Sequence, residues 1–194
     1  NIERERLRPG DAVNIARDVS FRRVRWRIGG VLRAFTPVTL TGSWTAGESV
    51  NLAPSGTTAP AQGPSETVAL TLTLQPVTPL RVDTTWLSSS LDSSTGLAIF
   101  RNEIVRAKVN WQVTRELAVR AIIQHDNTSA NGALTTLRTG RRFNTDFLVS
   151  YVVNPWTAVY AGYNGNARTV SALELTWLRD AQQLFVKISY VYRF

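Results

Sequence analysis

The sequence predicts an all-β fold, an antiparallel transmembrane β-barrel of which this chain holds about nine strands, as part of a larger barrel with an even strand number. Three observations support this prediction. Apolar and polar residues alternate from about residue 19 to the end of the chain, which is the period of a strand with two different faces. Short turns alternate with long polar loops. Trp, Tyr and Phe gather near the ends of the alternating segments.

The first four predicted strands cover residues 20–28, 38–45, 67–75 and 80–86. In the first strand Val24, Trp26 and Ile28 alternate with arginines. In the third, Leu70 and Leu72 alternate with threonines. β-Branched and aromatic residues are enriched in each segment, which favours extended structure.

The last five predicted strands cover residues 105–113, 117–124, 146–153, 156–163 and 184–194. The alternation is cleanest in the first of these, where Val105, Ala107 and Val109 share one face. It is weakest over 156–163. The final run places aromatic residues on one face and Lys187 on the other. Residues 1–18 are expected to form a separate N-terminal segment, either a weak strand or a remnant of an upstream barrel, followed by barrel strands over 19–194.

The connections carry a second signal. Short turns are expected near residues 34–37, 76–79, 114–116 and 154–155, and long loops over 46–65, 88–100, 126–144 and 164–183. Bacterial outer-membrane barrels have short periplasmic turns and long extracellular loops. A soluble β-sandwich is the alternative architecture, since its strands also have one apolar face.

Composition restricts the possible functions. The chain has 22 Lys and Arg against 14 Asp and Glu, a net charge of +8, which suits an anionic partner. It has no Cys, which excludes disulfides and Cys-ligated metals. No apolar run approaches the roughly 20 residues of a membrane-spanning helix. Because Met is absent as well, the chain is expected to be mature or partial.

Three segments resemble a known family: IVRAKVNWQVTRELAVRAIIQHD (Ile104–Asp126), TDFLVSYVVNPWTAVYAGYN (Thr145–Asn164) and QQLFVKISYVYRF (Gln182–Phe194). They are similar to the C-terminal β-barrel region of an uncharacterised Gram-negative outer-membrane protein family. Its full-length members carry an N-terminal carbohydrate-binding-module-like domain, which has no match here. The resemblance extends over about residues 80–194.

The resemblance implies a location in the bacterial outer membrane. The implied partners are outer-membrane lipid, the barrel-assembly machinery and, in some arrangements, other subunits of a membrane complex. The assembly signal in such proteins is an alternating last strand with a terminal Phe. In this chain its residues would be Leu184, Val186, Ile188, Tyr190, Tyr192 and Phe194.

The two faces of the predicted strands have different candidate roles. The expected aromatic belt at the membrane interfaces consists of Trp44, Trp86, Trp111, Tyr163, Tyr192 and Phe194. The expected lumen-facing basic residues are Arg23, Arg25, Arg27, Arg81, Arg106, Lys108, Arg120, Lys187 and Arg193. Only Asp83 and Asp146 are expected on the same face, where they would pair with arginines. A basic lumen favours anions, whereas the alternative is an internal lattice of ion pairs.

These residues lead to three alternative functions. The first is a membrane anchor or pore for an upstream periplasmic domain, with a basic lumen. The second is a scaffolding barrel subunit with a plugged lumen. The third is a barrel hydrolase built on His125, Asp126 and Ser129, which needs a convergence that sequence does not show. We expect no enzyme activity, no catalytic residue, no metal site, no cofactor and no nucleic-acid partner, because aromatic residues do not interleave with the arginines.

Overall fold

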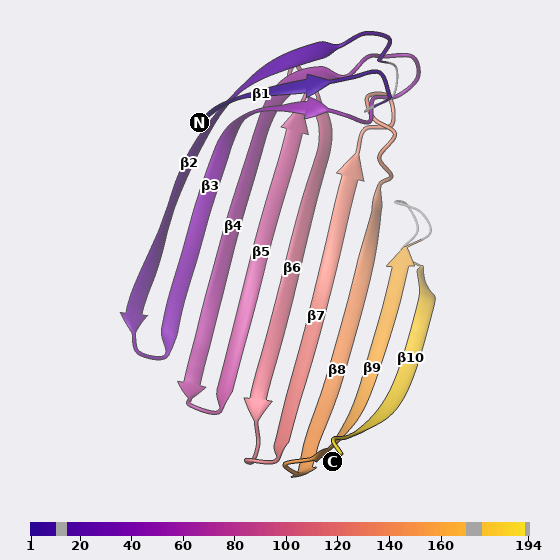
Figure 1. Cartoon of the computed structure of the whole chain (residues 1–194). Helices are drawn as coiled ribbons and strands as arrows, with labels where there is room; N and C mark the ends of the chain where they lie inside the picture. The colour runs from indigo at the N-terminus through magenta and orange to yellow at the C-terminus, as the bar shows by residue number, and fades with distance from the viewer. Residues whose placement is uncertain (11–14, 170–175, 193–194) are drawn as a thin grey trace.

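The computed structural model describes residues 1–10, 15–169 and 176–192, which form ten β-strands in one antiparallel sheet (Figure 1). The strands are β1 (Ile2–Leu7), β2 (Val19–Phe35), β3 (Val38–Asn51), β4 (Ala61–Val77), β5 (Leu80–Asp92), β6 (Ala98–Gln112), β7 (Leu117–Ala130), β8 (Gly140–Asn154), β9 (Thr157–Thr169) and β10 (Trp177–Tyr190). The predicted all-β, antiparallel class is confirmed. The structure has ten strands where about nine were predicted, because the N-terminal segment forms β1, as one of the two alternatives for that segment expects. Within the described ranges no helix is long and apolar enough to cross a membrane.

The sheet is a simple meander in which each strand pairs with the strands before and after it in the chain. Its two edges do not meet. β1 pairs only with the first part of β2, and β10 pairs only with β9. The described residues therefore form an open, curved sheet (Figure 1), not a closed barrel. Both β10 and the second half of β2 have one edge without a neighbouring strand.

The connections alternate between the two ends of the sheet as predicted. Short turns at residues 36–37, 78–79, 113–116 and 155–156 lie at one end, here called the short-turn end. Longer connections over 52–60, 93–97 and 131–139 lie at the other, here called the long-loop end. The fourth connection at that end includes residues outside the described ranges.

Strands β2 to β10 are 13 to 17 residues long, longer than predicted. The predicted long loops were too long because their first and last residues continue the hairpin ladders. Strand β7, for example, continues past Gln124 to Ala130, and β4 already begins at Ala61. Backbone groups gain partners by extending a ladder, even where the side chains no longer alternate in polarity.

The C-terminal strand also differs from its prediction. β10 begins at Trp177 and ends at Tyr190, whereas the prediction ran from 184 to the last residue. Tyr192 follows the strand, and its ring centroid lies 6.5 Å from that of Tyr190. The predicted sites Arg193 and Phe194 lie outside the described residues.

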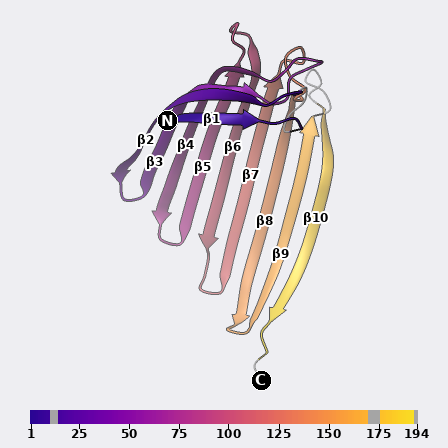
Figure 2. The ribbon, with the colours of Figure 1, turned by 45° about the horizontal axis from the view of Figure 1, so that its top comes forward.

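The long-loop end holds the buried residues of the sheet. Strand β1 and the first part of β2 run across the top of the sheet at this end (Figures 1 and 2). The buried hydrophobic residues there are Leu7, Val50, Leu91 and Ile99. The fold thus has its small core at one end, and the long body of the sheet has no covering layer.

Two loops at the long-loop end dock on each other. The β3–β4 loop (52–60) and the β7–β8 loop (131–139) meet in an isolated antiparallel bridge between Pro54 and Thr135. The Thr135 hydroxyl donates to the Ala53 carbonyl at 2.7 Å, and the Thr136 N–H donates to the same carbonyl at 2.9 Å. Thr135 is only 1% exposed. These contacts join two loops that are separated along the sheet by the β5–β6 hairpin.

Gly47 permits the close approach of strands at this end. A Cβ atom at this position would lie 2.1 Å from the Val24 carbonyl oxygen. No side chain fits there, so only glycine allows β2 to cross so near β3. The part of β2 that precedes this contact pairs with β1, so Arg23 and Arg25 lie next to the acidic residues of β1.

Candidate functional site

The register of the ladders gives the sheet one continuous apolar face. Directly opposed residues form an unbroken row across six strands: Val82, Val109, Ala121, Phe147, Tyr163 and Leu184. Further toward β2, Leu72 lies opposite Leu40, and Leu40 lies opposite Leu32. Side chains of this face are open to the surroundings, with Ile28 at 69% and Leu184 at 78% exposure. Soluble monomers rarely expose contiguous apolar patches of more than roughly a few hundred Å², so a surface of this kind marks an interaction site.

A row of aromatic residues limits this face toward the long-loop end. The Trp44 indole N–H donates to Glu66 Oε1 at 2.6 Å, and the Trp86 indole N–H donates to Glu103 Oε1 at 2.6 Å. In β10, Trp177 has its ring centroid 6.3 Å from that of His125 and 6.4 Å from that of Phe143. We call these residues the upper aromatic row: Trp44, Trp86, His125, Phe143 and Trp177.

A second aromatic group limits the same face toward the short-turn end. It consists of Trp111, Tyr151 and Tyr190, with Tyr192 just beyond β10, and we call it the lower aromatic row. Along β8, Phe143 of the upper row and Tyr151 of the lower row bound a stretch of about 26 Å, at about 3.3 Å per residue. The apolar residues lie between two amphipathic borders.

The predicted aromatic belt is placed only in part as expected. Trp111 lies one residue from the end of β6. Trp44 and Trp86 lie inside β3 and β5, because these strands continue beyond them. Tyr163 is at the midpoint of β9, opposite Phe147. The sequence pattern misplaced Tyr163 because the predicted strand ended there.

Residues of the predicted assembly signal also lie on the apolar face. Leu184, Val186 and Ile188 lie opposite Tyr163, Ala161 and Val159 of β9. Their exposure follows from the position of β10 at the open edge of the sheet. The alternation predicted for this segment is therefore present in the register of the strand.

The opposite face is polar and carries most of the predicted basic residues. Arg27, Arg81, Arg106, Lys108, Arg120 and Lys187 occupy alternate positions from those of the apolar residues. Threonines fill the space between them on β3 and β4, where Thr41 opposes Thr71 and Thr71 opposes Thr85. The polar side chains of this surface favour contact with water, and its positive charges attract anions.

Arg23 and Arg25 form a separate ion-pair cluster with β1. Arg23 Nη1 lies 3.0 Å from Glu5 Oε2, and Glu3 pairs with both arginines. The hydrogen bond from Arg25 lowers the pKa of the Glu3 carboxyl below its usual value, aided by the charges of both arginines and opposed by burial. β1 therefore supplies the acidic partners of Arg23 and Arg25, as the alternative of an internal lattice of ion pairs expects.

The two predicted acidic residues of the polar face behave differently. Asp83 accepts bonds from Arg81 Nε at 3.0 and 3.1 Å and from the Thr73 hydroxyl at 2.7 Å. Asp146 instead accepts a hydrogen bond from the Asn164 amide. The expected pairing with arginine is therefore present for Asp83 and absent for Asp146 among the described contacts.

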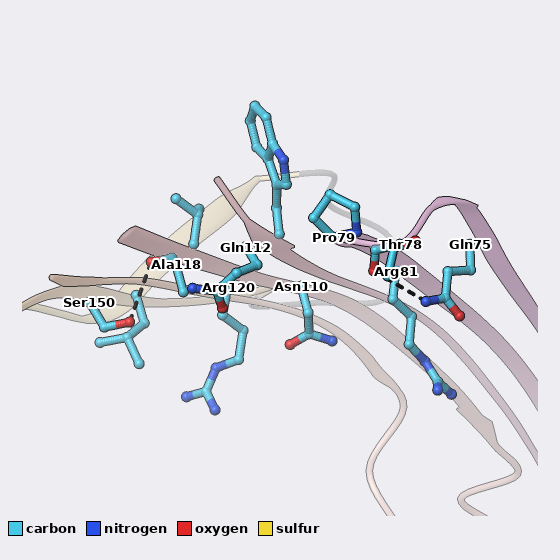
Figure 3. A pocket seen from close by; sticks show the side chains of 12 residues that line it. Gln75, Thr78, Pro79, Arg81, Asn110, Gln112, Ala118, Arg120 and Ser150 are labelled. Carbon is cyan, nitrogen blue, oxygen red and sulfur yellow. Dashed lines mark hydrogen bonds between the residues drawn. The ribbon is translucent and has the colours of Figure 1, made fainter. Parts of the chain in front are cut away.

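A cavity of about 390 Å³ lies at the short-turn end, between β5, β6, β7 and β8. Arg81, Asn110 and Arg120 lie directly opposite one another on three adjacent strands. Figure 3 shows their side chains extending to the same side of the sheet. Among the described residues, the guanidinium groups of Arg106 and Arg120 form no hydrogen bond or ion pair. Arg120 lines the cavity, whereas Arg106 lies outside it. Both residues are exposed, so their charges can attract an anion from solution.

The sequence analysis did not assign four residues to the polar face. They are Arg33, Asp126, Arg142 and Arg168, which oppose Thr39, Ile104, Asp126 and Arg142 in the ladders. Each of them lies just outside the bounds of a predicted strand, so its face was not assigned. Extending the alternation by a few residues at each strand end would have found them.

The hydrolase arrangement does not assemble in this structure. His125 and Asp126 are consecutive in β7, so their side chains point to opposite faces of the sheet. His125 lies opposite Val105 and Phe143 on the apolar face. Asp126 lies opposite Ile104 and Arg142 on the polar face. In the described part of the chain there is also no group of three His, Asp or Glu residues that could hold a metal ion.

Comparison with known proteins does not add an assignment. No protein-family model matches the chain, and no curated protein is similar to it. The resemblance to an outer-membrane barrel family described above therefore stays a prediction.

Proposed function

We propose that this chain is part of a bacterial outer-membrane β-barrel that serves as an anchor or pore for a periplasmic domain, with an anion-preferring polar interior. The observation that carries the proposal is the division of one sheet into two faces. The apolar face is continuous, exposed and bordered by the two aromatic rows, while the opposite face is basic and polar. Membrane barrels have this arrangement, with an outward apolar band about 25 Å tall between aromatic girdles.

The proposal places a requirement on the strand edges. In lipid, each backbone N–H or C=O group without a partner costs several kcal/mol, so a membrane-spanning sheet must close on itself. The free edges of β2 and β10 therefore need further strands under this proposal. The expected complete barrel has an even number of strands.

The polar face favours a path for anions. Arg106, Lys108 and Arg120 lie on adjacent strands β6 and β7. In the ladders, the one acidic residue directly opposite any of them is Asp83, which faces Lys108. Rings of Arg and Lys side chains favour anion passage. Arg81 is less available, because it is bonded to Asp83.

The test is conductance of the purified full-length protein in planar lipid bilayers. Under a tenfold KCl gradient we expect single-channel currents with a reversal potential that indicates chloride preference. The double variant Arg106→Gln, Arg120→Gln should shift this potential toward the cation side. Arg101→Gln is the control, because Arg101 lies opposite Ser90 and Ser129, on the other face of the sheet. A conductance whose selectivity is the same in all three proteins would contradict the proposed lining.

A scaffolding barrel with a plugged interior is the second candidate. It is favoured by the docked β3–β4 and β7–β8 loops, which lie across the long-loop end. This function predicts no conductance and a stable partner protein in native membranes. A monomeric protein with open channels would exclude it. The opposed directions of His125 and Asp126 give the hydrolase alternative no support, so we propose no enzymatic activity.

A further inference from the structure

A second cavity, of about 480 Å³, lies at the long-loop end beneath the β7–β8 loop. Its basic lining consists of Arg138, Arg141, Arg142 and Arg168. It also contains one carboxylate, that of Asp126, and several threonine hydroxyls. This cavity is separate from the one in Figure 3, which lies at the other end of the strands.

The arrangement of charges in this cavity is unbalanced. Arg142 of β8 lies directly opposite Arg168 of β9. Like charges directly opposed across two strands are destabilising, unless a counter-charge lies between them. Arg168 has one such partner, because its Nε donates to Asp180 Oδ1 at 2.7 Å. Among the described residues, the side chains of Arg138 and Arg142 have no hydrogen bond or ion pair.

Among the described residues, Asp126 forms no hydrogen bond or ion pair with these arginines. It lies opposite Arg142 in the β7–β8 ladder. Its Oδ1 atom is nevertheless buried without a hydrogen-bond partner. Arg141 lies opposite Asn127, on the other face of β8. The other three arginines, set against Asp126 and Asp180, leave an excess of one positive charge.

The excess charge and the size of the cavity indicate the class of ligand. A phosphate monoester carries roughly 1.5 to 2 negative charges at neutral pH, and guanidinium groups bind its oxygens in pairs. A cavity of this volume lies within the range of sites for small organic molecules. Because Asp126, Arg142 and Arg168 all belong to the polar face, a dissolved molecule can reach them without passing the apolar surface.

We infer that this cavity binds a small organic phosphate or sulfate monoester, held mainly by Arg138 and Arg142. The inference goes beyond the proposed function, because binding at this site requires neither a membrane nor conductance. Arg138 of the loop and Arg142 and Arg168 of the polar face would form a capture site at the long-loop end of the sheet.

The experiment is isothermal titration calorimetry of the full chain in a neutral detergent. Glucose 6-phosphate is the probe, inorganic phosphate tests the anionic group alone, and glucose is the uncharged control. We expect both phosphates to bind and glucose not to bind. Arg142→Gln and Arg138→Gln should each weaken glucose 6-phosphate binding roughly tenfold or more, because each removes charged hydrogen bonds.

Two further variants make the test specific. Arg101→Gln removes a positive charge at the same end of the sheet but outside the cavity, so binding should change less than about twofold. Asp126→Asn removes a negative charge from the cavity and should tighten binding. Arg138 lies in a loop, so its variant remains informative if Arg142→Gln does not fold.

Several results would overturn the inference. They are no heat of binding with either phosphate, an equal loss of affinity in Arg101→Gln and Arg142→Gln, or weaker binding in Asp126→Asn. Binding of glucose with the affinity of glucose 6-phosphate would show that the arginines do not select the ligand. A conductance defect has no bearing on any of these outcomes.

Discussion

An arginine scan along β4 tests whether the apolar face contacts lipid. Leu72 lies midway between Glu66 and Val77, opposite Leu40 on one side and Thr84 on the other. If this face is in a bilayer, Leu72 is near the midplane, where an arginine costs about 2–4 kcal/mol. Val68 lies opposite Trp44 in the upper aromatic row. There an arginine should cost only about 0–1 kcal/mol, because its side chain can reach the interface.

Thr71→Arg is the control on the polar face. Thr71 lies between Thr41 and Thr85, and its hydroxyl is 3.2 Å from that of Thr85. Replacing it removes one neutral hydrogen bond, worth about 1 kcal/mol. The new arginine would remain in contact with water on that face.

The assay is guanidinium unfolding of the full-length protein in lipid vesicles, followed by tryptophan fluorescence. The expected order of destabilisation is Leu72→Arg first, then Thr71→Arg and Val68→Arg, with a gap of about 2 kcal/mol after the first. Equal free energies of unfolding for Leu72→Arg and Val68→Arg would refute the depth argument. Equal tolerance of arginine at positions 71 and 72 would refute the assignment of the two faces.

Two smaller predictions concern the long-loop end. Because the pKa of Glu3 is held below its ordinary 4.5 in the folded protein, the β1–β2 pairing should be stable at neutral pH and weaken as the pH falls through that lowered value. Hydrogen-exchange protection factors of β1 should show this loss, and Glu3→Gln should abolish the dependence on pH. Thr135→Val removes the 2.7 Å bond to the Ala53 carbonyl and should destabilise the docked loops by about 1 kcal/mol, seen as faster proteolysis between residues 131 and 139. Thr136→Val removes only a 3.4 Å contact and should have less effect; equal cleavage of both variants would contradict the role of Thr135.

The fold class could be predicted because strand alternation is a local property. Val105, Ala107 and Val109 identify the facing of β6 without any knowledge of its neighbours. The turn positions could be predicted equally well, since Pro37, Pro79 and nearby polar residues interrupt the alternation of apolar and polar residues. The strand ends were not, because ladder hydrogen bonds continue where side-chain polarity no longer alternates.

The candidate site could also be predicted only in part. The facing of Arg106, Lys108 and Arg120 was predictable from their alternation with apolar residues. Their partners were not, because ion pairing depends on register between strands. The pairing of Glu3 with Arg23 and Arg25 needed β1 to fold back over β2, and no local pattern indicates that bend.

The docked loops have a consequence for the order of folding. Pairing of each strand with its immediate neighbour allows the sheet to grow by successive hairpins, so that each new pairing closes only the loop between two consecutive strands. The bond between Thr135 and Ala53 joins residues 82 positions apart. The entropic cost of bringing these two residues together is large in an unfolded chain. It is small once β3 to β8 are in register. Loop docking is therefore a late kinetic step, and resistance of these loops to protease would mark the moment at which six strands have assembled.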